Sequence, residues 1–164
     1  MWRGIMSKKR RSDTFFPRIE GAPPPVTAVI ERRVRFHELD PMTVVWHGRY
    51  PEYFEEAQIA VAEKCGFSYP ILRDMGIMTP IHTFHLEYKQ SLFDGERFQV
   101  EASMIWSDAA RINMEYVIRK ENGTIASTGY TIQMFVDAAT QEVLWFPPPF
   151  WEKCCERWRN GEFA

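Results

Sequence analysis

The clearest pattern along the chain is a mostly apolar stripe at helical spacing between residues 50 and 64. Its members recur every three or four positions: Tyr50, Tyr53, Phe54, Ala57, Ala60, Val61 and Lys64. Four glutamates fall largely on the other side: Glu52, Glu55, Glu56 and Glu63. This division predicts an amphipathic helix that packs against a core. Because Pro51 suits a first turn and Gly66 suits a stop, we expect the helix to begin between residues 47 and 50.

Five further segments are rich in β-branched and aromatic residues and are typical of strands. They are residues 26–36, 81–91, 96–106, 111–120 and 124–137. Turn sequences at Asp94-Gly95 and Asn122-Gly123 separate the later segments, so we predict a meander of four strands after the helix. A short amphipathic helix is expected at residues 150–159. This order predicts an α+β fold in which one long helix packs on a curved, five-stranded antiparallel sheet.

The composition, with 45% hydrophobic and 26% charged residues among 164, suits a single domain. Residues 1–25 differ, because they combine a basic cluster at positions 8–11 with three consecutive prolines at 23–25. We therefore expect an extended N-terminal arm over residues 1–25, whose aromatic residues are able to fold back, and one domain over residues 26–164. The basic cluster either contacts a partner or stays solvated.

The formal net charge of −2 excludes a surface tuned as a whole to nucleic acid. No run of about 18 apolar residues offers a membrane span, and the N-terminus lacks the apolar core of a secretory signal. Cys65, Cys154 and Cys155 form no CxxC motif, and we expect reduced thiols in a soluble, cytoplasmic protein. His82 and His85 fall on opposite sides of a strand, so neither a metal site nor a cofactor is expected.

One stretch, HELDPMTVVWHGRYPEYFEEA at residues 37–57, carries more polar chemistry than a helix start requires. It contains Glu38-x-Asp40-Pro41-x-x-Val44-Val45-Trp46-His47-x-x-Tyr50, followed by Tyr53-Phe54-Glu55-x-Ala57. This run resembles the signature of the hot-dog-fold thioesterases of the 4-hydroxybenzoyl-CoA thioesterase-like family. The resemblance covers roughly residues 27–146 and includes Val136-Asp137-x-x-Thr140 near the end of the last strand.

The resemblance implies a hot-dog fold, dimers with active sites at the subunit interface, and hydrolysis of an acyl thioester, usually of coenzyme A. It also implies that Asp40 is the catalytic carboxylate and that the backbone N–H of His47 polarises the thioester carbonyl. Both roles suit the chemistry, because the free N–H groups at a helix N-terminus stabilise negative charge on a carbonyl oxygen. An ionised Asp40 acts either as a nucleophile or as a general base toward water, and the sequence leaves both open.

Each candidate residue also has a structural interpretation. Asp40 before proline is typical of a turn, and His47 acts either through its backbone N–H or through its side chain. Trp46 and Tyr50 are candidates for substrate contact and equally for core packing. Arg111 is the preferred candidate for the phosphates of coenzyme A, although a solvated strand charge is the ordinary role of such a residue.

The resemblance is imperfect at three positions. Family members often have glycine or alanine where this chain has Met42 and Thr43, and asparagine where it has Arg49. Three hypotheses therefore remain: a homodimeric or homotetrameric acyl-CoA thioesterase, a thioesterase acting on acyl carrier protein, and a non-catalytic acyl or thioester binder. A dehydratase is disfavoured, because the chain lacks a second acid-base residue in the expected arrangement.

Overall fold

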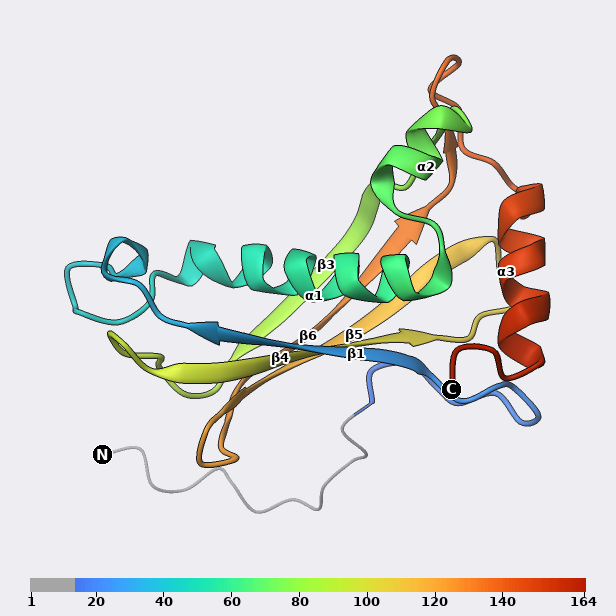
Figure 1. Cartoon of the computed structure of the whole chain (residues 1–164). Coiled ribbons are helices and arrows are strands. Elements are labelled where there is room, and N and C mark those ends of the chain that lie inside the picture. The colour runs from blue at the N-terminus through green and yellow to red at the C-terminus, as the bar shows by residue number, and fades with distance from the viewer. Residues whose placement is uncertain (1–13) are drawn as a thin grey trace.

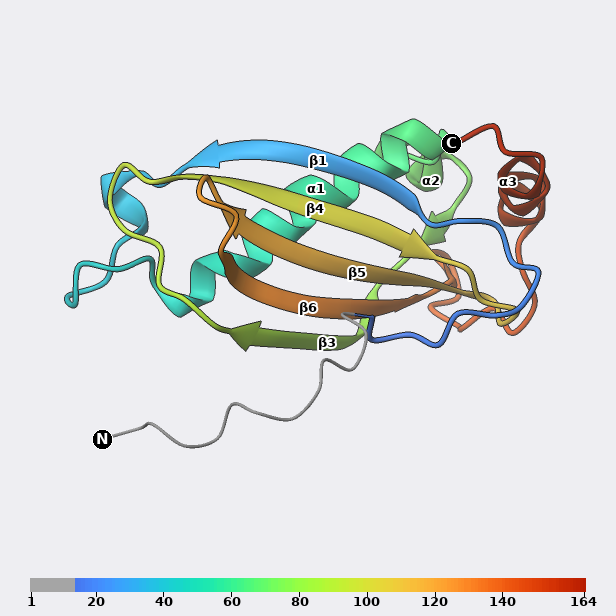
Figure 2. The same ribbon diagram turned by 90° about the horizontal axis from the view of Figure 1, so that it is seen from below.

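The protein is described here over residues 14–164 in a computed structural model. Its centre is an antiparallel sheet of five strands in the order β1-β4-β5-β6-β3, with helix α1 (Tyr50–Cys65) across one face (Figure 1). The strands, seen side by side in Figure 2, are β1 (Val26–Arg33), β3 (Ile81–Tyr88), β4 (Arg97–Ile105), β5 (Arg111–Lys120) and β6 (Ile125–Met134). The predicted α+β fold, with a long helix on a five-stranded antiparallel sheet, is confirmed.

The predicted meander of four strands is wrong in one connection. β4, β5 and β6 follow one another as hairpins, but β3 pairs with β6 at the far edge and not with β4. The turn at residues 93–95 therefore leads the chain from one edge of the sheet towards the other. Local turn sequences cannot specify this, because they define a reversal of the chain but not its next hydrogen-bonded neighbour.

The core lies between α1 and the sheet. Tyr53, Phe54, Ala57 and Val61 of α1 are buried against alternate residues of the central strands, and the Phe54 ring stacks on Tyr116 with centroids 4.4 Å apart. Burying a side chain of this size contributes about 1.5–3 kcal/mol to folding. The periodicity that predicted the helix therefore also identified the residues that fix it on the sheet.

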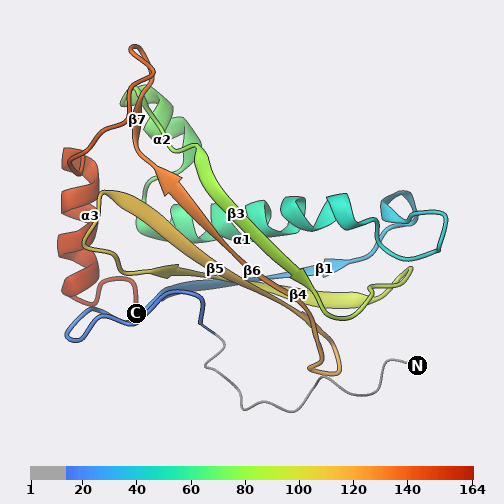
Figure 3. The same cartoon turned by 180° about the vertical axis from the view of Figure 1, so that it is seen from behind.

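Smaller elements complete the ends of the sheet. Helix α2 (Tyr69–Asp74) and a two-stranded sheet of β2 (Ile77–Met78) and β7 (Val136–Asp137) stand beyond the ends of β3 and β6 (Figure 3). Helix α3 (Pro149–Arg159) buries Trp151, Cys154 and Trp158, as its predicted apolar face requires. Within residues 14–164, no helix has the length and apolar character needed to cross a membrane.

The part of the N-terminal arm that is described lies against the sheet face opposite α1. The Phe16 N–H donates to Glu115 Oε1 at 2.8 Å, and the Phe15 ring contacts His85 and Tyr130. At the other end of this segment, Trp158 Nε1 donates to the Pro24 carbonyl at 2.7 Å. The aromatic residues of this part of the arm thus fold back onto the domain, whereas the basic cluster at residues 8–11 lies outside the described residues.

Candidate active site

The first element of the candidate site is the head of α1, which is preceded by a short 3-10 turn, η2 (His47–Arg49). The Trp46 carbonyl accepts a hydrogen bond from the Arg49 N–H at 2.9 Å. Among the described residues, the backbone hydrogen bonds provide no acceptor for the N–H groups of His47 or Gly48. Free amides at a helix start carry partial positive charge, so this turn is suited to bind an anionic oxygen.

The second element is a tight hairpin over residues 38–46 that leads directly into η2. Its two arms are joined by hydrogen bonds from the Asp40 N–H to the Val44 carbonyl at 2.8 Å and from the Trp46 N–H to the Glu38 carbonyl at 2.9 Å. Thr43 at the tip has a φ of 63°, in the left-handed region. The hairpin therefore holds Asp40 on one arm and places the other arm immediately before the free amides.

The Asp40 side chain is partly exposed at the tip of this hairpin. Its Oδ1 accepts a hydrogen bond from the Met42 N–H at 2.8 Å, which is the turn geometry expected of aspartate before proline. Its second oxygen, Oδ2, has no protein hydrogen-bond partner among the described residues. One oxygen thus shapes the turn, while the other is available to a water molecule or a substrate.

Trp46 and Gly48 form a close pair at the helix head. The Trp46 side chain is 47% exposed and its ring centroid lies 5.1 Å from that of His47. A Cβ on Gly48 would lie 2.3 Å from the Trp46 ring, so the absence of a side chain lets the ring fold over the backbone there. The Trp46 ring consequently lies beside the free amides, where a substrate would contact it.

Tyr50 and Tyr88 connect the helix head to the edge strand. Tyr50 is 3% exposed, burial raises its pKa to about 12, and its ring meets that of Tyr88 edge-on at 5.0 Å. The Tyr88 hydroxyl donates to the His47 carbonyl at 2.8 Å. The pattern of residues 81–91 predicts only a strand and gives Tyr88 no role in the site. Its position at the end of β3 was the available signal, since that end faces the helix start.

Glu38 is a second residue to which the sequence assigns no definite role, since its pattern suits either a supporting polar group or a surface carboxylate. Although it is a carboxylate, it is only 2% exposed, and it accepts hydrogen bonds from Arg32 Nη2 at 3.1 Å and the Arg35 N–H at 2.7 Å. Arg32 also pairs with Glu56 of α1. The sequence gave a weak signal, because Glu38 belongs to the motif and a run of three arginines within four residues precedes it.

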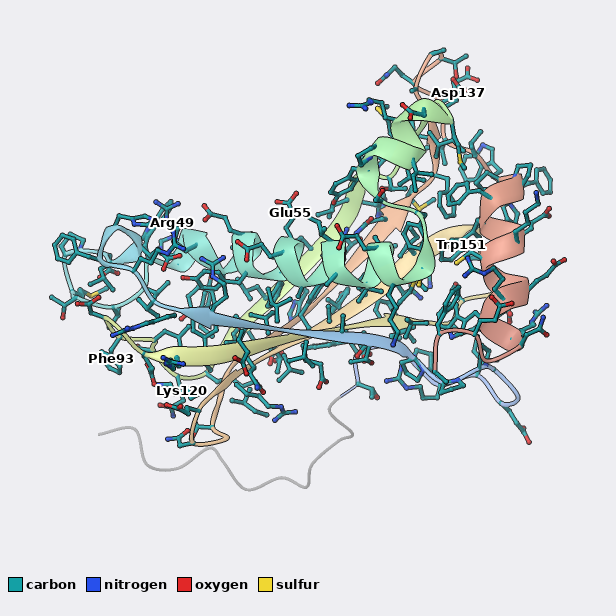
Figure 4. All side chains as sticks on the ribbon, viewed as in Figure 1. Arg49, Glu55, Phe93, Lys120, Asp137 and Trp151 are labelled. Carbon is teal, nitrogen blue, oxygen red and sulfur yellow. The ribbon has the colours of Figure 1, made fainter. Side chains whose placement is uncertain are left out.

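The remaining candidates do not all lie together. Arg49 lies at one end of the molecule, near the labelled Phe93 and Lys120, and Trp151 marks the opposite end (Figure 4). Arg111 begins β5 and Lys120 ends it, so within one chain Arg111 lies at the far end of the sheet from Asp40. Arg49 lies at the helix head, where its guanidinium pairs with Glu52 at 2.8 Å.

Three cavities of the single chain are lined by residues other than Asp40 and the helix head, and one of them reaches Arg32, the partner of Glu38. The largest of the three, about 590 Å³, is lined by residues of β1, β4, β5 and the turn after β5, including Arg32, Arg33, Arg97 and Arg119, and the other two are about 410 and 150 Å³. Their linings, within residues 14–164, include neither Asp40 nor His47. The segments of the site instead expose large apolar side chains: Phe36, Met42, Trp46, Phe84, Tyr88 and Phe93. Asp40 and His47 thus line none of these three cavities, and exposed apolar side chains lie on the neighbouring segments.

Comparison with known proteins identifies the class of this fold. Residues 34–154 match the model of the thioesterase-like superfamily. The chain is 33% identical over 98 residues to a provisionally named esterase of Aquifex aeolicus (strain VF5), which covers 60% of this chain and 77% of the relative. The protein therefore belongs to the thioesterase-like superfamily and has the hot-dog fold expected from its motif. Its class is thioester hydrolase.

Two solved structures are similar over most of the chain. The DHNA-CoA thioesterase of Staphylococcus aureus is 28% identical with a TM-score of 0.73, covering 84% of this chain and 95% of that one. A hypothetical protein of Staphylococcus aureus, solved in complex with CoA, is 19% identical with a TM-score of 0.71 and covers 85% and 86% of the two chains. At 19% identity, the second similarity supports the fold alone.

Proposed function

We propose that the protein hydrolyses an acyl thioester of coenzyme A, with Asp40 as general base or nucleophile and the amides of His47 and Gly48 as the oxyanion site. The observation that carries this proposal is the hairpin at residues 38–46, which joins Asp40 to the head of α1 through two backbone hydrogen bonds between its arms. A carboxylate and a set of free amides are thereby held by one rigid unit.

The chemistry follows from these two groups. With Asp40 as general base, Oδ2 accepts a proton from a water molecule as that water attacks the thioester carbonyl carbon. Negative charge then develops on the carbonyl oxygen, and the amides of His47 and Gly48 stabilise it. Collapse of the intermediate expels the thiolate of coenzyme A, which needs no strong acid because thiols are acidic. With Asp40 as nucleophile, the same amides stabilise the charge while an acyl-aspartate anhydride forms and the thiolate of coenzyme A leaves. Water then hydrolyses the anhydride, which releases the acid and restores the Asp40 carboxylate.

The choice of coenzyme A is supported by the similar structures. One is named a DHNA-CoA thioesterase and another was solved in complex with CoA. Trp46 and Tyr50, which flank the free amides, are proposed to contact the acyl group or the pantetheine arm. The three free cysteines support a reducing compartment, and we place the protein in the cytoplasm on that ground.

We further propose that the active site is completed by a second copy of the chain. β3 is an edge strand, and Phe84 on its α1 side is 39% exposed although its ring stacks on Phe54. An exposed edge with apolar side chains is suited to pair with another strand. Antiparallel pairing of two β3 strands about a twofold axis would cover Phe84 and Tyr88 and bring a second surface to the helix head.

The test is a panel of acyl-CoA and acyl carrier protein thioesters, with release of the thiol followed by a chromogenic reagent. Turnover of one or more acyl-CoA substrates supports the proposal. Turnover restricted to acyl carrier protein would replace coenzyme A by the carrier as the substrate. Tight binding of thioesters with no turnover on any member of the panel would make the protein a binder and overturn the hydrolytic proposal.

A further inference from the structure

Glu38 occupies an unusual position for a carboxylate. Its side chain is buried, and it lies two residues before Asp40 at the base of the hairpin. Removing a charge from water is unfavourable unless partners compensate for the lost hydration. Glu38 has such partners, because Arg32 Nη2 lies 3.1 Å from Oε1 and the Arg35 N–H lies 2.7 Å from Oε2.

Arg32, the side-chain partner of Glu38, contacts two main elements of the fold. Arg32 lies near the end of β1, its guanidinium carbon is 5.1 Å from the centre of the Tyr53 ring, and its other arm pairs with Glu56. Tyr53 and Glu56 are both residues of α1. Arg32, packed over the Tyr53 ring, therefore links the base of the hairpin to α1 and β1, while its pair with the exposed Glu56 is a surface contact of small energetic weight.

Glu38 acts on both halves of the proposed site. Its side chain is held by Arg32, and its carbonyl accepts the Trp46 N–H at 2.9 Å, so it fixes the residue directly before His47. Asp40 follows two residues later on the same arm. A shift of Glu38 thus changes the distance between the carboxylate and the free amides.

From these contacts we infer that Glu38 is a positioning residue that sets the geometry between Asp40 and the amides of His47 and Gly48 through its bridge to Arg32. The inference rests on the proposed hydrolysis for its catalytic consequence, but the anchoring itself is a property of the chain. Glu38 does not touch the substrate in this account. It acts through the hairpin that carries Asp40.

The experiment compares Glu38→Gln with Glu56→Gln. Each substitution removes one carboxylate charge that pairs with Arg32, but only Glu38 belongs to the hairpin. We expect Glu38→Gln to lower kcat about 100-fold with KM changed less than about twofold, because small displacements of reacting groups reduce rates by such factors. For Glu56→Gln, an exposed pair, both constants should stay within about twofold of the wild type.

A second readout does not depend on activity. Amide exchange measured by NMR on the full chain should become about tenfold faster or more at Asp40 and Trp46 in Glu38→Gln, with the amides of β4 and β5 unchanged. Unchanged exchange at both hairpin amides overturns the inference. Equal acceleration throughout the sheet also overturns it, because Glu38 would then support the whole fold.

The outcomes separate this inference from the proposed function. If the wild type hydrolyses no thioester, the proposed function fails, and the exchange data still decide whether Glu38 anchors the hairpin. If the wild type is active and Glu38→Gln keeps its kcat, the positioning role is refuted. Should Glu38→Gln not fold, Arg32→Lys decides, since an ammonium lacks the planar guanidinium that binds Glu38 while it packs over the Tyr53 ring. We expect a kcat about tenfold lower for that variant, and an unchanged kcat refutes the role.

Discussion

Thr43 carries the most unusual backbone conformation of the proposed site. Its φ of 63° lies in the left-handed region, which is unfavourable for a β-branched residue. It also stands at a position where the family often has glycine or alanine, so the departure noted in the sequence coincides with local strain. Strain of this kind persists where surrounding contacts fix the conformation, and the hairpin hydrogen bonds of Asp40 and Trp46 do so here.

Thr43→Gly is therefore expected to leave the free energy of unfolding unchanged or to raise it by up to about 1 kcal/mol, because relief of strain offsets the greater freedom of the unfolded chain. Urea denaturation measures the change. Thr124→Gly is the matched control, since Thr124 lies in an exposed turn with an ordinary φ, and it should lose stability. A clear loss of stability in Thr43→Gly would show that Thr43 contributes contacts that outweigh its strain.

The buried Tyr50 hydroxyl makes the free energy of unfolding depend on pH in alkaline solution. Burial raises its pKa from 10 to about 12, so the native state keeps a proton that the unfolded chain loses above pH 10. The stabilisation is fully present below pH 10 and is lost as pH rises from 10 to 12. Between pH 9 and 11, the free energy of unfolding should fall by about 1 kcal/mol less in Tyr50→Phe than in the wild type, after allowance for solvent screening. Equal losses would contradict the buried, protonated state of Tyr50.

Among the helices and strands, hydrophobic periodicity predicted the elements better than the turn sequences predicted how the strands pair. The helix expected from the stripe at residues 50–64 is α1, and the five expected strands all exist with boundaries shifted by a few residues. The pairing of β3 with β6 at the edge of the sheet, instead of with β4, was not predictable, because strand order depends on which surfaces pack together and not on the turn sequences. α2 and the β2–β7 pair were missed, since elements of six and two residues give too few positions for a periodic pattern.

The same limit applies to the site. The motif located Asp40 and His47 because both lie within one continuous stretch, whereas Tyr88 reaches His47 from 41 positions away along the chain. Glu38 was visible in the motif, but its burial depends on Arg32 and α1, which one-dimensional spacing does not reveal. Contacts between distant elements thus account for most of what the sequence left unassigned.

The packing of α1 on the sheet depends on Gly129 in β6. A Cβ there would lie 2.3 Å from the His85 carbonyl oxygen and 2.7 Å from the Phe54 ring. Gly129→Ala should therefore reduce the free energy of unfolding by about 1–3 kcal/mol, as overpacking of a core does. Ser127→Ala, a smaller change on the same face of β6, is the control and should cost about 1 kcal/mol through one lost hydrogen bond. Denaturation that ranks the two variants in the reverse order would contradict this close contact.

For the whole molecule, the central consequence of the fold is that the single chain leaves its site open. None of the three cavities is lined by Asp40 or His47, and large apolar side chains of the site and of β3 are exposed. The sheet has two edge strands, β1 and β3, and the proposed dimer uses β3 because α1 and the site face that side through Phe84 and Tyr88. If a second copy completes the site in this way, substrate binding depends on dimer formation.

Phe84→Asp is expected to convert the dimer to monomers and to lower kcat/KM at least about tenfold, because a charge would be buried between the paired edges. Light scattering coupled to gel filtration measures the mass. Val29→Asp is the matched control, since Val29 is 51% exposed on the other edge strand and should leave the dimer intact. Dissociation caused by Val29→Asp and not by Phe84→Asp would move the interface to β1.

The proposed catalytic role of Asp40 is tested by the kcat of Asp40→Asn on the best acyl-CoA substrate, beside Asp94→Asn as a control in the neighbouring exposed turn. The asparagine keeps the acceptor that the Met42 N–H requires, so the turn is preserved while the negative charge is lost. We predict that kcat falls about 10³-fold or more in Asp40→Asn, as loss of a base or nucleophile requires, and stays near wild type in Asp94→Asn. A kcat for Asp40→Asn equal to that of the wild type would contradict the central claim.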